Sequence, residues 1–89
     1  MAYRIEFAPK AQRDFNALDK PIRSRLARRI NSLAENPFPQ GIKKLAGEDD
    51  LYRLRVGDYR VLYQIQGKRL VVLVAGIGHR GDVYRGLKR

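Results

Sequence analysis

The chain contains no cysteine, no tryptophan and a single histidine. The lack of cysteine excludes a disulfide framework and a thiolate metal site. No apolar run approaches the length of a membrane-spanning helix, and the N-terminal segment MAYRIEFAPK lacks the apolar core of a signal peptide. We therefore expect a cytoplasmic protein that has no contact with a membrane.

Acidic residues are also scarce, with 9 Asp and Glu against 19 Lys and Arg, which gives a formal net charge of +10. Such an excess attracts polyanions, of which nucleic acid is the commonest and an acidic protein the next. The length of 89 residues indicates one domain, residues 1–89, and a hydrophobic content of 44% suffices for one core.

The first third of the chain predicts one strand and two helices. Ala2–Phe7 alternates apolar and polar residues, as a half-buried strand does. Pro9 suits the first turn of a helix, and Asp19 is a candidate N-cap for a second helix that stops at Asn36 before a proline. Apolar residues recur at helical spacing in both segments: Ala11, Phe15 and Leu18, then Ile22, Leu26, Ile30 and Leu33.

The remaining chain predicts a loop, Pro37–Asp50, followed by three strands, Leu51–Val56, Tyr59–Gln66 and Arg69–Ile77. The dipeptides Gly57-Asp58 and Gly67-Lys68 separate these strands and match type II′ hairpin turns. The fold class is therefore α+β, with an N-terminal strand, an antiparallel helix hairpin and a three-stranded antiparallel meander. The helices should cover one face of the sheet.

The first hairpin has a register that follows from its two-residue turn. Val56 pairs with Tyr59, and Arg55 pairs with Arg60. Arg53, Arg55 and Arg60 then share the face away from the helices, where like charges directly opposite each other are destabilising. A phosphate between these guanidinium groups would relieve the repulsion. Alternatively, they extend into solvent or pair with acids such as Glu48 and Asp50.

The same face gains an apolar patch if Gly67-Lys68 fixes the second hairpin: Leu62, Val71, Leu73 and Ile77. Either a partner or the C-terminal tail, His79–Arg89, would cover it. At the start of the tail stand His79, Arg80 and Tyr84. A lone histidine is more often structural than catalytic, but histidine alone has an unperturbed pKa near neutrality. Tyr84 suits stacking on a base or covering the core edge.

Two blocks of sequence resemble a known family. The run from Leu51 to Tyr63 (LYRLRVGDYRVLY) and the run from Gly78 to Tyr84 (GHRGDVY) look like the RelE subfamily of the RelE/ParE toxins, with support from Glu35-Asn-Pro37 and Lys44-Leu-Ala-Gly47. The resemblance spans essentially the whole chain. It implies a toxin of a type II toxin–antitoxin system that enters the ribosomal A site and cleaves mRNA there. It also implies an acidic, RelB-like antitoxin and a joint complex that represses its own operon through operator DNA.

The resemblance also implies the site. Two sheet lysines of the family correspond to Arg53 and Arg55, and the family's later basic positions correspond to Arg60 and Arg80; the base-stacking tyrosine is Tyr84. Because arginine essentially never deprotonates, Arg55 cannot serve as the general base that the family assigns to lysine. We therefore interpret His79 as the acid–base group. Lys43 and Lys44 join Arg53, Arg55, Arg60, Arg80 and Tyr84 as expected RNA-binding residues.

Three functions remain open on the sequence. The first is a metal-independent endoribonuclease without a cofactor, in which a ribose 2′-OH attacks the adjacent phosphorus and the arginines stabilise the phosphorane. The second is a non-catalytic inhibitor of DNA gyrase, like the ParE branch. The third is a binding module whose cations serve antitoxin docking and operon repression alone.

Overall fold

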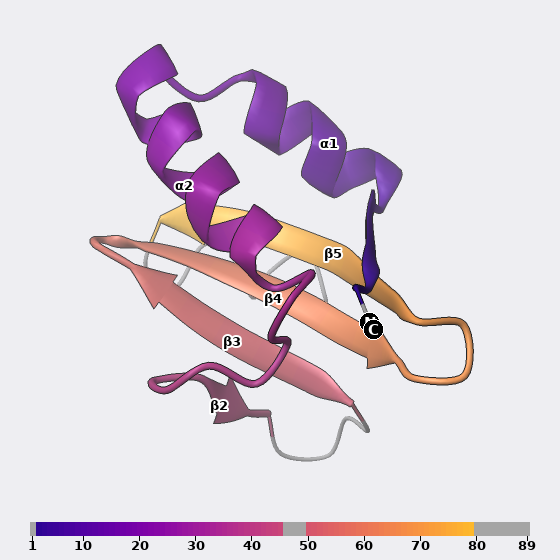
Figure 1. Ribbon diagram of the computed structural model, residues 1–89. Coiled ribbons are helices and arrows are strands. Elements are labelled where there is room, and N and C mark those ends of the chain that lie inside the picture. Colours follow the sequence, from indigo (N-terminus) through magenta and orange to yellow (C-terminus); the bar gives the residue numbers. More distant parts are fainter. Residues whose placement is uncertain (1, 46–49, 80–89) are drawn as a thin grey trace.

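The computed structural model describes residues 2–45 and 50–79, which form two helices packed on one face of a sheet (Figure 1). Neither helix in this part of the chain has the length and apolar character that a bilayer crossing requires. In chain order the elements are β1 (Arg4–Phe7), α1 (Pro9–Asn16), α2 (Lys20–Ser32), β2 (Lys43–Lys44), β3 (Leu51–Val56), β4 (Tyr59–Gln66) and β5 (Val71–His79). The predicted α+β class and the single helical layer are confirmed.

The strands are arranged in the order β1-β5-β4-β3-β2. Strand β1 runs parallel to β5, and the other neighbouring pairs are antiparallel. Two features of the strand arrangement were not predicted from the sequence. Residues 43 and 44 form a short edge strand inside the segment predicted as a loop, and β1 joins the meander by pairing with its last strand.

Prolines mark where both helices begin, and apolar residues at helical spacing form the face that each helix buries. Pro9 and Pro21 lie in their first turns, where a fixed φ is favourable and a missing N–H costs nothing. Asp19 occupies the N-cap position of α2 as predicted, although its side chain makes no capping hydrogen bond. The core lies between the helices and the sheet and contains these buried residues: Ala11, Leu26, Ile30, Leu33, Leu54, Val56, Val61, Tyr63, Ile65, Val72, Val74 and Ile77.

The first hairpin has the predicted register throughout, from Val56 opposite Tyr59 to Tyr52 opposite Tyr63. Gly57 has a φ of 61°, which a type II′ turn requires at its first central position. This turn keeps the alternation of side chains in phase across β3 and β4, so the sequence pattern alone determines which residues face the helices.

The second hairpin differs from its prediction in two ways. Gln66 pairs with Val71, so the loop has four residues instead of two, and Leu70 adopts a φ of 55° within it. Further along, Tyr63 pairs with Val74 but Leu62 pairs with Gly76, which leaves Ala75 as the extra residue of a β-bulge.

Because of the bulge, the side chains at the end of β5 lie on the opposite side of the sheet from where strict alternation would place them. Ile77 lies opposite Val61 in the helix-side core, so its predicted place on the arginine face is wrong. The predicted apolar patch is also not open to solvent, since Leu62 and Val71 have 0% exposure. Among the described residues, Phe38 is the exposed large hydrophobic residue, at 55%.

Candidate nucleic-acid interface

Positively charged side chains gather on the side of the sheet away from the helices. Leu54 and Val56 are buried beneath the helices, so alternation along β3 directs Arg53 and Arg55 to the opposite side. Arg60 shares that side because it lies directly across from Arg55, and Lys43 shares it because it lies directly across from Arg53. We call Lys43, Arg53, Arg55 and Arg60 the cationic face.

The cationic face contains two like-charge pairs in neighbouring rows, Lys43 with Arg53 and Arg55 with Arg60. The Cβ atoms of directly opposite residues lie about 5 Å apart, and like charges at this spacing destabilise a sheet. Sequence analysis found the second pair and missed the first, because residues 43 and 44 were assigned to a loop. The segment Ile42-Lys43-Lys44-Leu45 does not alternate, so no period-two pattern marks this short strand in the sequence.

Among the described residues, the ion pairs lie away from Lys43, Arg55 and Arg60. The ion pairs recorded between described residues use Glu6 and Asp14, with Arg4 2.9 Å and Arg69 3.8 Å from Glu6, and Lys10 3.1 Å from Asp14. Within that part of the chain, none of these three pairs involves Lys43, Arg55 or Arg60. The Nε of Arg55 instead donates to the Gly57 carbonyl oxygen at 3.4 Å, which is a long hydrogen bond.

Arg60 carries a buried donor. Its Nε lies out of solvent and has no hydrogen-bond partner among the described residues. An unpaired buried donor costs about 1–3 kcal/mol, and more for a charged group. On the other side of β4, strand β5 places Gly78 opposite Arg60 and Gly76 opposite Leu62. Strand β5 therefore has no side chain at either of these two positions. The arrangement suits an anionic group that approaches the sheet closely at Arg60 and accepts from its guanidinium.

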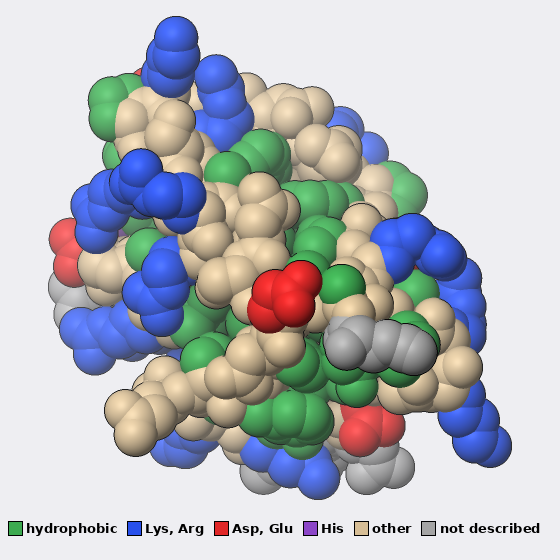
Figure 2. Space-filling view, viewed as in Figure 1, with side chains coloured by type: hydrophobic (Ala, Val, Ile, Leu, Met, Phe, Trp, Pro, Cys, Tyr) green, Lys and Arg blue, Asp and Glu red, His purple; other side chains and the backbone are tan. Residues whose placement is uncertain are grey.

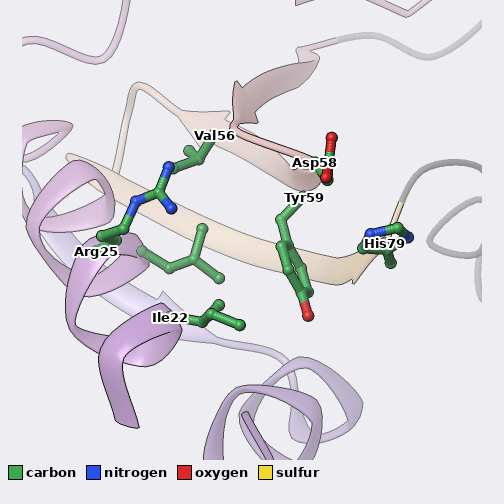
Figure 3. Close-up of a pocket in the computed structure, with 7 residues that line it drawn as sticks. Ile22, Arg25, Val56, Asp58, Tyr59 and His79 are labelled. Carbon is green, nitrogen blue, oxygen red and sulfur yellow. The ribbon is translucent and has the colours of Figure 1, made fainter. Parts of the chain in front are cut away.

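His79 lies on the other side of the sheet. It is the last residue of β5 and pairs with Tyr59, whose ring packs against the helix-side core. The two rings are 5.1 Å apart with an interplanar angle of 87°, and both line a pocket beside α2 (Figure 3). The structure therefore does not bring His79 together with Arg55 and Arg60, and the expectation that it acts on a phosphate held there has no geometric support.

Comparison with known proteins identifies the family. Residues 5–84 match the family model described as the ParE toxin of the type II toxin-antitoxin system parDE. The chain is 32% identical over 88 residues to the mRNA interferase toxin RelE of Escherichia coli strain K12, which covers 94% of this chain and 92% of that protein. It is 30% identical to toxin RelG of Mycobacterium tuberculosis over 89 residues, 96% of this chain and 99% of that protein.

Solved structures agree. The E. coli RelBE toxin–antitoxin complex contains a chain that superposes with a TM-score of 0.81 at 26% identity, covering 91% of this chain and all of that one. In the RelE–RelB complex of Pyrococcus horikoshii the TM-score is 0.79 at 31% identity, with 92% and 99% covered. This chain is a RelE-type member of the RelE/ParE toxin family.

The remaining predicted residues of this RelE-type toxin separate into two groups. Lys44 pairs with Tyr52 on the helix side, so it does not join the cationic face, although it was expected to bind RNA with its neighbour. Adjacent residues of a strand face opposite sides, and the loop assignment concealed this. Arg80 and Tyr84 lie outside the described residues.

Tyr63 anchors the region that precedes β2. Its buried hydroxyl donates to the Pro37 carbonyl oxygen at 2.9 Å, and its ring stacks on Tyr52 at 5.8 Å. Burial, and to a smaller extent the neighbouring Tyr52, raises the pKa of the Tyr63 hydroxyl, which therefore stays protonated as a donor. This contact attaches residues 37–42 to the sheet just before Lys43 enters the edge strand.

Metal-ligating side chains do not cluster in the described part of the toxin, where no three His, Asp or Glu residues come together. What the cationic face offers instead is four positive groups arranged in two rows on a rigid sheet. Positioned cations can hold a phosphodiester and stabilise negative charge that develops on it.

Proposed function

We propose that this RelE-type toxin is an endoribonuclease that cleaves mRNA at the ribosomal A site without a metal ion. The observation that carries the proposal is the placement of Arg55 directly opposite Arg60, where the buried Nε of Arg60 has no hydrogen-bond partner among the described residues. A fold gains no stability from this arrangement, whereas a bound phosphodiester would supply the missing acceptors. The name of the E. coli relative, an mRNA interferase, supports the same conclusion.

In the proposed reaction the ribose 2′ oxygen attacks the adjacent phosphorus and the bond from phosphorus to the 5′ oxygen breaks. The 2′-OH proton leaves as attack proceeds, and the departing 5′ oxygen takes up a proton. The products are a 2′,3′-cyclic phosphate and a free 5′-OH. Arg53, Arg55 and Arg60 bind the phosphate and stabilise the extra negative charge of the phosphorane, the largest expected contribution. By family resemblance, Arg80 orients the phosphate and Tyr84 stacks on a base.

Proton transfer is the part of the mechanism for which this chain departs from its family. Arg55 does not deprotonate, and His79 lies across the sheet from the arginines. The variant His79→Gln decides the matter. Loss of cleavage with unchanged thermal stability would assign His79 to the reaction in spite of its position, and retained cleavage would remove it from the mechanism.

The proposed role of Arg60 in stabilising the phosphorane is tested with the variant Arg60→Gln in a purified translation system. The measurement is the mapping of mRNA 5′ ends. We expect cleavage to fall by about 100-fold or more, as for loss of one donor to a developing oxyanion. The matched control is Arg13→Gln, which removes the same charge from an exposed position on α1. Retained cleavage in Arg60→Gln, or an equal loss in Arg13→Gln, would overturn the assignment.

The main alternative is the gyrase inhibition of the ParE branch, because the matching family model carries the ParE name. That activity does not require a cationic face of this arrangement. Gyrase-linked DNA breaks without mRNA cleavage would establish the alternative, whereas cut mRNA without such breaks would support the nuclease.

We also propose an acidic, RelB-like antitoxin as the partner, since relatives have been solved in complex with RelB. The complex would reach operator DNA through the antitoxin. In a binding module without catalysis, Arg60→Gln would weaken antitoxin binding. For the nuclease, the same variant abolishes growth arrest in cytoplasmic expression while antitoxin binding persists.

A further inference from the structure

Two adjoining hollows lie at the β3–β4 turn, on the helix side of the sheet. The first, which we call the turn pocket, has a volume of about 300 Å³ and is lined by Ile22, Arg25, Leu26, Val56, Asp58, Tyr59 and His79. The second, the arginine pocket, has a volume of about 200 Å³ and is lined by Arg25, Arg28, Arg29, Val56 and Gly57. Arg25 and Val56 line both, so the two hollows adjoin.

The turn pocket has a lining that suits a planar ring. Ile22, Leu26 and Val56 supply apolar surface, and the rings of Tyr59 and His79 meet edge to face 5.1 Å apart (Figure 3). Its volume lies at the small end of the range for ligand sites. Aromatic side chains in such pockets stack on nucleobases with little regard to base identity.

The arginine pocket offers three guanidinium groups. Within residues 2–45 and 50–79, no recorded ion pair reaches Arg25, Arg28 or Arg29. Figure 2 shows several Lys and Arg side chains gathered at the left of the view, beside one acidic patch at its left edge. Guanidinium forks match phosphate oxygens and bind them bidentately.

Gly57 lies close against the Arg25 guanidinium. A Cβ at this position would stand 2.9 Å from the Arg25 Nη2 atom, which is closer than a real contact allows. The turn residue therefore leaves room for Arg25 to lie between the two pockets. Asp58, the carboxylate at the rim of the turn pocket, would repel a phosphate there and favour its placement among the arginines.

From this arrangement we infer a second nucleotide-binding site, which takes a nucleoside 5′-phosphate with its base in the turn pocket and its phosphate in the arginine pocket. The site lies on the opposite side of the sheet from the cationic face and does not depend on cleavage. The two surfaces meet at one turn, because Arg55 donates to the Gly57 carbonyl oxygen. A free nucleotide and one nucleotide unit of an RNA strand share the required chemistry.

The test is titration of the full chain with AMP, followed by isothermal calorimetry and amide NMR shifts. We expect Arg25→Gln to weaken AMP binding about tenfold, as for loss of one charge-assisted phosphate contact. Arg13→Gln, the matched change on α1, should weaken it less than about twofold. Ribose 5-phosphate should bind at least about fivefold more weakly than AMP, because it lacks the stacking base.

Three results would overturn the inference. The first is no detectable AMP binding up to about 10 mM, because guanidinium contacts to the phosphate together with a stacked base should bind more tightly than that. The second is equal affinity for ribose 5-phosphate and AMP, which would leave the turn pocket unused. The third is displacement of AMP by hexaglutamate at equal concentration, which would indicate docking of an acidic protein. The double variant Arg28→Gln with Arg29→Gln repeats the test if Arg25→Gln perturbs folding.

A fully 2′-O-methylated trinucleotide separates the two nucleotide sources. It has no 2′-OH nucleophile, so binding is measured without cleavage, and the result is independent of the nuclease proposal. Tighter binding than AMP, with the same loss in Arg25→Gln, would support an RNA strand as the ligand. Affinity equal to that of AMP would support a free nucleotide, and no binding of either probe would reject the site.

Discussion

Removal of one arginine from the cationic face should stabilise this toxin while abolishing its activity. The change that we consider is Arg55→Gln. Arg55 lies directly opposite Arg60, is exposed, and makes one long hydrogen bond to Gly57. Glutamine is polar but shorter than arginine, and because the position is exposed the substitution removes like-charge repulsion without opening a cavity.

The expected gain follows from the cross-strand scale. Like charges directly opposite cost up to about 1 kcal/mol, and solvent screening at an exposed position reduces this to roughly 0.5 kcal/mol. In a domain of 60–100 residues, 1 kcal/mol shifts the melting temperature by roughly 4–8 °C, so Arg55→Gln should melt about 2–4 °C higher. Cleavage of mRNA should fall by about 100-fold in the same protein.

Calorimetry in low salt measures the shift, and a double-mutant cycle with Arg60→Gln isolates the pair. Arg13→Gln lowers the net charge equally and controls for general self-repulsion. Sulfate should raise the melting temperature of the parent chain more than chloride does at equal ionic strength, and this difference should shrink in Arg55→Gln. A variant that melts no higher than Arg13→Gln, or a coupling energy of zero, would refute the reasoning.

Three further predictions concern other parts of the chain. Tyr63→Phe should cost about 1–2 kcal/mol in urea denaturation, because the buried Pro37 carbonyl loses its donor; an unchanged midpoint would contradict this. Gly57→Ala should cost about 1–2 kcal/mol by the same assay, since its φ of 61° disfavours a side chain, and Gly67→Ala, with open space around its Cβ, serves as the control. Cleavage should persist in EDTA, and a strict Mg²⁺ requirement would reject the proposed mechanism.

Much of the fold could be predicted because local signals agree. The bounds Leu51–Val56 and Tyr59–Gln66 match the structure to the residue, since a two-residue turn and strict alternation fix both strands. The pairing of β1 with β5 could not be predicted in this way. It joins residues about seventy positions apart in the chain, and apolar alternation shows that a strand is half-buried without identifying its neighbour.

The errors in the site come from the second hairpin. Gly67-Lys68 resembles a two-residue turn, but the left-handed backbone of Leu70 extends the loop to four residues. The bulge at Ala75 then shifts the alternation of β5 by one residue. Without it, His79 would face the same side as Arg60. A single extra residue in β5 therefore places His79 and Arg60 on opposite sides of the sheet, although the sequence had predicted that they act together.

The distribution of charge links the proposed nuclease activity to its inhibition by an acidic antitoxin. The chain has nine acidic residues and nineteen Lys and Arg residues. Among the described residues, the ion pairs involve Glu6 and Asp14, which lie away from Lys43, Arg55 and Arg60. RNA phosphates and the carboxylates of an acidic antitoxin are both attracted to such an excess of positive charge. In our proposal the antitoxin binds without requiring Arg60, so it competes with RNA through general attraction to the excess positive charge and not through an identical set of side chains. Such competition needs no change in the toxin's conformation, and salt weakens the binding of both polyanions.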